Sequence, residues 1–129
     1  EQDNDPAQWR RMIRMRAVDI VQPDVCYVGG LSRALRVAAM AAEAGLPCVP
    51  HSANLSMVSV FTLHLLAAIP NAGPRMECSI EQTPWAEDVY SPKLRVESGE
   101  VRVPEGPGWG VEINQPWLAA AQRGVSEAP

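Results

Sequence analysis

Positive charge is scarce in this sequence. Its 129 residues carry 11 Lys and Arg against 15 Asp and Glu, a net charge of −4. Binding to nucleic acid requires a basic surface, so this balance argues against a nucleic-acid partner. Four arginines cluster near the start, at positions 10, 11, 14 and 16. A solvated helix face explains them better than a phosphate-binding patch does.

Cysteine is also scarce, and no apolar run is long. The three cysteines, Cys26, Cys48 and Cys78, form neither a CxxC pair nor a metal-ligand spacing, which indicates buried reduced thiols in a cytosolic protein. No signal peptide is visible. The apolar segment 57–69 is too short to span a bilayer and contains His64. We therefore expect a cytoplasmic protein with no membrane partner.

An initiator methionine is missing, because the chain begins at Glu1. The composition, 47% hydrophobic and 20% charged, is ordinary for a globular domain with a real core. We expect the chain to be the C-terminal part of a longer protein. Parallel strands cut from a larger sheet expose an unpaired edge, so we expect this piece alone to fold poorly.

What is present is an alternation of short apolar strands with helices. Asp5 and Pro6 predict the start of the first helix, and Ser32 is the expected cap of the second. The expected helices are 6–15, 32–44 and 57–69, and the expected strands are 18–21, 46–50 and 75–80. From the second helix, the residues expected to face the sheet are Leu31, Leu35, Ala38, Ala39 and Ala42. This order predicts an α/β fold with parallel strands covered on both faces.

Ionisable residues recur at the expected strand ends. Glu1, Asp24, His51 and Glu77 follow one another at intervals of 23, 27 and 26 positions. A (β/α)8 barrel devotes roughly 30 residues to each strand and helix, and its active site lies at the carboxyl ends of the strands. The spacing therefore predicts that these four side chains share one mouth of a barrel.

The last third of the sequence has a different pattern. The loop TPWAEDVYSP leads into residues 93–103, which alternate around Ser98 and Gly99 and predict a β-hairpin. A loop rich in glycine and proline follows at 104–110. A short helix is expected from Asn114 to near Gly124, and the tail SEAP is expected to fray.

Asp24 and His51 form the sharpest chemical pattern. Taken singly, an aspartate after proline commonly serves a turn, and a histidine at a strand end is more often structural. On neighbouring strand ends, the carboxylate would fix the tautomer of the imidazole and raise its basicity. The other ring nitrogen would then serve as a general base near neutral pH.

Glu1 and Glu77 would add two carboxylates to the same mouth. Each also has a plain interpretation as a residue exposed to water. Together with Asp24 they would repel one another unless a cation or protonation relieved the charge. Hard oxygen ligands indicate Mg²⁺, whose remaining ligands would come from sequence outside this chain.

Two further features have structural interpretations. Gly29 and Gly30 lie between a strand and a helix, but they lack the GxGxxG and GxxxxGK[ST] patterns. We therefore prefer a plain turn to a nucleotide-binding loop there. His64 lies in the middle of a helix and is assigned to structure.

The ordered set of motifs resembles the enolase superfamily, specifically its mandelate racemase subgroup. The motifs are DIVQPD followed by GG, then GLPCVPH, then ECS, and finally GEVRVPEGPGWGVE, in order from Glu1 to about Trp117. The resemblance implies a modified (β/α)7β barrel. Residues 1–92 would be its C-terminal βα units. Residues 93–129 would form a hairpin, a loop and a short helix that close onto a capping domain outside this chain.

The resemblance also implies a role for each candidate residue. Glu1 matches a ligand of an essential Mg²⁺, and Asp24 and His51 match a catalytic dyad. Glu77 matches a glutamate that hydrogen-bonds the developing oxyanion of the substrate. The implied reaction is abstraction of the proton next to a carboxylate, which leads to an enediolate.

These roles predict a Mg²⁺-dependent enzyme that removes water from a sugar acid. One alternative is a racemase or epimerase of a 2-hydroxy acid that uses the same intermediate, and another is a non-catalytic α/β piece. The family's lysine motif, its first two metal ligands and its capping domain would precede Glu1. We therefore expect this chain alone to be inactive and the full-length protein to be a homo-oligomer.

Overall fold

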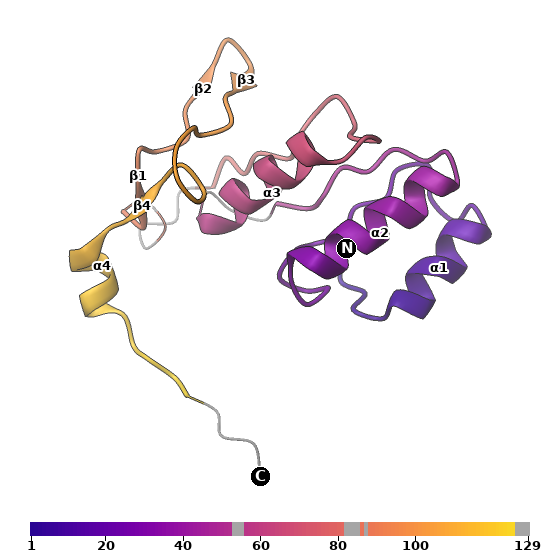
Figure 1. Ribbon diagram of the computed structural model, residues 1–129, viewed down its shortest axis with the longest axis horizontal. Helices are drawn as coiled ribbons and strands as arrows, with labels where there is room; N and C mark the ends of the chain where they lie inside the picture. Colours follow the sequence, from indigo (N-terminus) through magenta and orange to yellow (C-terminus); the bar gives the residue numbers. More distant parts are fainter. Residues whose placement is uncertain (53–55, 82–85, 87, 126–129) are drawn as a thin grey trace.

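The computed structural model describes residues 1–52, 56–81, 86 and 88–125. The tail SEAP, and residues 53–55, 82–85 and 87 of two predicted loops, lie outside them. The elements are α1 (Pro6–Arg14), α2 (Leu31–Glu43), α3 (Met57–Ala68), β1 (Tyr90–Ser91), β2 (Val96–Glu97), β3 (Glu100–Val101), β4 (Glu112–Ile113) and α4 (Gln115–Ala120). Figure 1 shows α1 beside α2 at one end of the molecule, and the short strands with α4 at the other.

Three extended segments run parallel to one another in the first region of the chain. Single bridges pair Val21 with Cys48, Asp24 with His51, and Cys48 with Ala72. Backbone hydrogen bonds support each pair; the Val21 N–H, for example, donates to the Pro47 carbonyl at 2.9 Å. The predicted parallel α/β order is therefore present, with segments 21–24, 48–51 and 71–73 as neighbours.

The three predicted strands are shorter than expected. Within the segment 18–21 only Val21 forms a β-bridge, and within the segment 46–50 only Cys48 does. The bridge between Asp24 and His51 lies just beyond both segments. Residues 75–80 form no strand, and the third segment pairs earlier, at Ala72. Coverage on both faces is also wrong for the outer segments, since Ile20 is 48% exposed and Ile80 is 96% exposed.

The first two helices begin as local sequence dictates, with one correction. The Asp5 side chain accepts a hydrogen bond from the Ala7 N–H at 2.8 Å, and Pro6 occupies the first turn, as predicted for α1. The N-cap of α2 is Gly30 at φ 104°, without a side-chain hydrogen bond. The prediction that Ser32 caps this helix is therefore wrong; the left-handed glycine turns the chain instead.

The buried face of α2 also differs from the predicted one. Leu35 is 40% exposed and Ala39 is exposed, whereas Ala38 is buried as expected. The buried positions are Ala34, Val37, Ala38 and Ala41. Each buried position lies one residue before a predicted one, so the predicted face was rotated from the buried face by about 100°.

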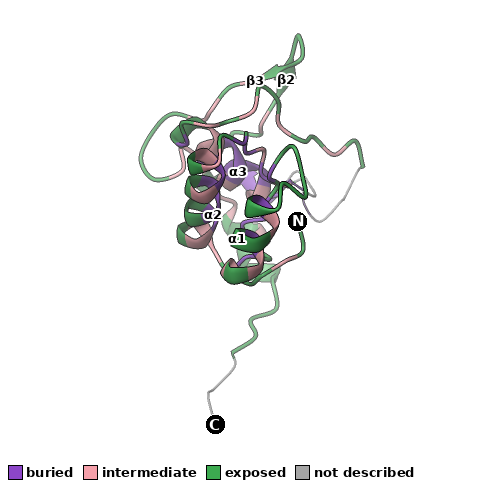
Figure 2. Ribbon diagram, turned by 90° about the vertical axis from the view of Figure 1, so that its right-hand side faces the viewer, coloured by how far each residue is buried: buried purple, intermediate pink, exposed green. Residues whose placement is uncertain are grey.

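The helix α3 is apolar on more than one side because it contributes to two cores. Leu65 belongs to a large cluster with residues from α1, α2 and the parallel segments. Val60 packs instead with Val89 and Tyr90 of the C-terminal region. Figure 2 shows the buried residues gathered between α1, α2 and α3. A helix that is apolar all round is expected to be covered on several sides.

The C-terminal region consists of two antiparallel pairs and a short helix. The strands β2 and β3 form the predicted hairpin, with Ser98 at φ 54° and Gly99 at φ 81° in the turn. Two consecutive residues with positive φ are typical of the tight hairpin turn whose twist matches its strands. Tyr90 and Ser91, predicted to lie in a loop, form β1 and pair with β4. The last helix ends at Ala120, earlier than predicted.

Candidate active site

The backbone brings Asp24 and His51 face to face. The two residues form a parallel bridge, and the His51 N–H donates to the Pro23 carbonyl at 3.1 Å. The imidazole Nδ1 lies 2.7 Å from Oδ2 of Asp24. The expected carboxylate–imidazole pair is therefore present in the geometry, with Asp24 only 2% exposed.

The second oxygen of Asp24 is also held in place. Oδ1 accepts hydrogen bonds from the N–H groups of Cys26 at 2.6 Å and Tyr27 at 3.0 Å. These bonds replace the water that the buried carboxylate has lost. Because an ionised carboxylate only accepts, the Nδ1 of His51 must carry the proton of their shared hydrogen bond. When the ring is neutral, this arrangement leaves its Nε2 without a proton.

The two glutamates lie on the Nε2 side of the ring. Oε2 of Glu1 is 3.4 Å and Oε2 of Glu77 is 3.7 Å from Nε2 of His51. Their side chains are 46% and 45% exposed, whereas that of His51 is 13% exposed. All four residues singled out from the sequence thus gather at one point. Glu77 reaches it from an extended segment rather than from the strand that was predicted.

Sequence reasoning missed a group of small polar residues beneath the site. The Ser52 N–H donates to Oε2 of Glu77 at 3.0 Å, and the Ser52 hydroxyl lies 3.1 Å from that of Ser59 on α3. The Thr62 hydroxyl, also on α3, donates to the His51 carbonyl at 3.4 Å. All three residues are buried. For Ser59 and Thr62, their polarity within the apolar segment 57–69 was the available signal, since buried hydroxyls need partners.

Tyr27 was also missed. Its ring lies nearly parallel to the imidazole of His51, at 23° and with the ring centres 6.3 Å apart. The side chain is 49% exposed. Its place three residues after Asp24, on the turn that follows the strand end, was the available signal.

The candidate residues include the type of ligand expected for Mg²⁺, but too few of them to form a complete site. Glu1 offers a half-exposed carboxylate oxygen, the type of ligand that Mg²⁺ prefers, at the rim beside the dyad. Within residues 1–52, 56–81, 86 and 88–125, no group of three His, Cys, Asp or Glu side chains could hold a metal ion. The described residues therefore do not form a complete metal centre by themselves.

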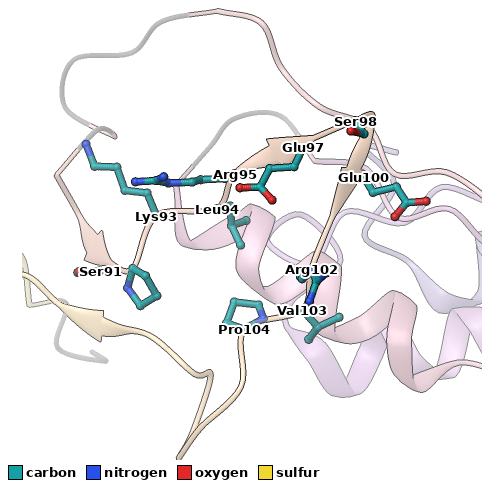
Figure 3. Close-up of a pocket in the computed structure, with 11 residues that line it drawn as sticks. Ser91, Lys93, Leu94, Arg95, Glu97, Ser98, Glu100, Arg102, Val103 and Pro104 are labelled. Carbon is teal, nitrogen blue, oxygen red and sulfur yellow. The ribbon is translucent and has the colours of Figure 1, made fainter.

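Two hollows flank the hairpin. One of about 440 Å³ is lined by Ser59 of α3, by Glu77 and by apolar residues of the hairpin, and so adjoins the candidate site. The other, of about 900 Å³, is lined by the hairpin and the segments on either side of it (Figure 3). It contains none of the four candidate residues, and both Arg95 and Glu97 line it. The chemistry therefore favours the smaller hollow.

The three cysteines differ in burial, which corrects the sequence prediction. Only Cys48 is buried, and Cys26 and Cys78 are exposed, although all three are free thiols. Burial raises the pKa of the Cys48 thiol to about 12. Partial burial and then the negative charge of Asp24 raise the pKa of the Cys26 thiol.

The other sequence interpretations concern Gly29, Gly30 and His64. Both glycines have positive φ, 91° and 104°, and form the turn into α2, as preferred over a nucleotide-binding loop. Nε2 of His64 lies 2.9 Å from the Trp109 carbonyl, and the two rings meet edge to face. His64 thus connects α3 to the C-terminal region, in agreement with its structural assignment.

No helix of the part that the structure describes is long and apolar enough to cross a membrane.

Comparison with known proteins agrees with this geometry. Residues 1–117 match the family described as "Enolase C-terminal domain-like". A solved candidate racemase from Roseobacter denitrificans is 54% identical, with a TM-score of 0.88 over 95% of this chain and 34% of its own. L-talarate dehydratase from Polaromonas sp. JS666, solved with Mg and L-glucarate, is 30% identical, with a TM-score of 0.75 over 95% of this chain and 32% of its own.

A relative with a curated enzyme name is also similar to this chain. Arabinonate dehydratase from Saccharolobus solfataricus is 30% identical over 106 residues, which cover 82% of this chain. This chain spans only 28% of the length of that relative. The family match covers nearly the whole chain, and the two structural matches each cover 95% of it. The chain belongs to the enolase superfamily and to its mandelate racemase subgroup.

Proposed function

We propose that the full-length protein is a Mg²⁺-dependent lyase that removes water from a sugar acid. The observation that carries the proposal is the Asp24–His51 pair at 2.7 Å, with Glu1 and Glu77 within 4 Å of the other ring nitrogen. The arrangement offers a base on one side of a substrate and carboxylates around the charge that develops. Such pairing of base and oxyanion stabilisers is suited to carbon acids, which barely ionise in water.

In the proposed first step, Nε2 of His51 takes the proton from the carbon next to the substrate carboxylate. The electron pair of the broken C–H bond moves into the carboxylate and forms an enediolate. Asp24 keeps the ring in the tautomer that has Nε2 free, and its charge stabilises the imidazolium that results. The carboxylates of Asp24 and Glu1, 2.7 Å and 3.4 Å from the two ring nitrogens, offset the positive charge of the imidazolium.

The enediolate needs stabilisation on its oxygens. Glu77, in its protonated form, donates a hydrogen bond to one of them, and the Ser52 N–H holds the Glu77 carboxyl group in position. Glu1 supplies one oxygen ligand for Mg²⁺, which contributes positive charge against the developing oxyanion when it is bound. Enzymes lower barriers by about 8–23 kcal/mol in total, and stabilisation of this kind supplies a large part.

Loss of water completes the reaction. The imidazolium of His51 returns its proton to the hydroxyl on the neighbouring carbon. The carbon–oxygen bond breaks, water leaves, and the electron pair of the enediolate forms the carbon–carbon double bond. The resulting enol converts to a 2-oxo acid. The names of the arabinonate and L-talarate dehydratases, and the L-glucarate bound to the latter, support a sugar acid as substrate.

Racemisation is the second candidate, because the relative with 54% identity is described as a candidate racemase. The same enediolate would then be reprotonated on its opposite face by a group outside this chain. The two reactions differ in a simple measurement. A dehydratase releases water and forms a 2-oxo acid, whereas a racemase incorporates solvent deuterium at the α-carbon and inverts it without loss of water.

The test uses the full-length protein with Mg²⁺, arabinonate, L-glucarate and other five- and six-carbon sugar acids in deuterated solvent. We expect 2-oxo acid formation with at least one of them, and we expect His51→Asn to abolish α-proton exchange. The chain contains one other histidine, so His64→Asn is a matched control that should retain exchange. Exchange that persists unchanged in His51→Asn would reject the role of this residue as the base. No exchange in the parent protein with any of these acids would favour a non-catalytic protein.

The proposal extends to the organisation of the whole protein. Residues 1–92 would supply the last βα units of a modified (β/α)7β barrel. Residues 93–129 would close onto a capping domain outside this chain. We propose further that the full-length protein acts in the cytoplasm and that it is a homo-oligomer. Light scattering of the purified protein tests the oligomeric state.

A further inference from the structure

Tyr27 is an aromatic residue beside the candidate base. Its residue surface is 49% exposed in this chain, it belongs to neither buried cluster, and its ring pairs with the imidazole of His51. Its hydroxyl makes no hydrogen bond with any residue of the described part of the chain.

The backbone fixes Tyr27 relative to His51 through one shared group. Asp24 accepts the Tyr27 N–H at Oδ1 and lies against the imidazole with Oδ2. The buried carboxylate of Asp24 therefore holds both the backbone of Tyr27 and the ring of His51 in position. The two rings lie 23° from parallel, with their centres 6.3 Å apart, within the range of offset aromatic pairs.

The hydrogen bond to Asp24 alone does not fix the imidazole plane. It holds Nδ1 at one point, and the ring can still tilt about that point because the last torsion of histidine is broad. A tilt moves Nε2, the atom that must meet the substrate proton at hydrogen-bond distance. A neighbouring ring lying nearly parallel to one face restricts this motion.

We propose that Tyr27 is a positioning residue whose ring holds the imidazole plane of His51 so that Nε2 meets the α-carbon of the substrate. The inference rests on the proposed function, in which His51 is the base. The contact is between the two rings, so the ring of Tyr27 and not its hydroxyl carries the role. Phenylalanine at this position therefore preserves the role, and alanine removes it.

The first measurement is the steady-state rate of α-deuterium exchange by the full-length protein with its best sugar acid. We expect Tyr27→Ala to lower kcat about 5-fold to 10-fold, the range that aromatic pairs support, with KM changed less than about twofold. Tyr27→Phe should restore kcat to within about twofold of the parent. Leu35→Ala, a truncation at a 40% exposed site on the outer helix α2, is the matched control and should leave kcat unchanged.

The second measurement does not depend on turnover. The NMR signal of the His51 Nδ1 proton, which is shared with Asp24, should be sharp in the parent and in Tyr27→Phe. It should broaden in Tyr27→Ala, because a looser ring exchanges this proton faster with water. An unchanged signal together with unchanged kcat in Tyr27→Ala would overturn the inference. If the signal depends on the ring but the parent exchanges no α-proton, the proposed function fails and the ring contact stands.

Discussion

Residues 1–81 and residues 86–125 fold by different means. The first region has parallel segments covered by helices, and its core extends from Trp9 to Ile69. The second has two antiparallel pairs of two residues each. Among the residues that the structure describes, the buried members of its core are Val89, Tyr90 and Val60 of α3. All four candidate residues lie in the first region. The candidate active site therefore lies in the region whose core is formed by its own helices and segments. The second region completes its core with Val60 of α3, a helix that it shares with the first.

The largest expected effect concerns the first region alone. Asp24→Asn keeps the two backbone N–H bonds only if the amide oxygen replaces Oδ1, which turns the amide nitrogen toward His51. The amide then donates to Nδ1, so the ring proton moves to Nε2 and the base is lost. We expect α-proton exchange to fall by about 10³–10⁴-fold, as when an aspartate that orients a catalytic histidine is replaced by asparagine.

The control for this substitution lies in the second region. Asp88 is exposed and pairs with Lys93 at 3.1 Å. Asp88→Asn should leave exchange within about twofold of the parent, because an exposed ion pair contributes little. A comparable loss in both variants would show that the two regions are coupled and would break the comparison.

Two truncations on α3 test whether it serves two separate cores. Leu65→Ala should lower the free energy of unfolding by about 2–5 kcal/mol, and Val60→Ala by about 2 kcal/mol, since both side chains are fully buried. Amide hydrogen exchange of the full-length protein resolves the location. Leu65→Ala should speed exchange in α1 and α2, and Val60→Ala in residues 89–113. Identical patterns would mean that the two cores unfold as one.

His64 gives a smaller effect at the junction between the regions. His64→Ala removes the contact of Nε2 with the Trp109 carbonyl and the edge-to-face ring contact. We expect a loss of about 1–2 kcal/mol in urea unfolding, the usual range for such contacts. Faster amide exchange should be confined to the loop around Trp109. No loss of stability would mean that the second region is held by Val60 and its neighbours alone.

The smallest effect separates the thiols within the first region. At pH 8 the buried Cys48 stays protonated, because its pKa is raised to about 12, and should resist iodoacetamide until the protein unfolds. Cys26, exposed but with a raised pKa, should react slowly, and more quickly at pH 9.5. Peptide mass spectrometry measures both. Since the unfolded thiol ionises near pH 8.5, the contribution of Cys48 to stability falls as pH rises above about that value.

The sequence allowed the parallel order and the meeting of four distant residues to be predicted. Both depend on the backbone: parallel strands end at one edge, and a period of about 25 residues brings each end to the same place. The hairpin was predictable for a similar reason, since Ser98 and Gly99 mark its turn.

The remaining features could not be predicted, for separate reasons. The phase of α2 was wrong because the apolar residues at 31, 35, 38, 39 and 42 also form a continuous stripe, about 100° from the buried one. The burial of Cys26 and Cys78 was wrong because Cys26 lies on the turn after Asp24 and Cys78 lies on a segment that forms no strand. Ser52 was missed because its backbone N–H bonds to Glu77, 25 residues away in sequence.

The backbone bridge between Asp24 and His51 has an evolutionary consequence. The distance between the two side chains is set by strand pairing, so insertions or deletions in the loops that flank α2 leave the pair intact. A slip of one residue would turn one side chain to the opposite face and separate them. Descendants of such a protein can therefore diversify the loops that recognise substrates while they inherit the proton-transfer pair unchanged.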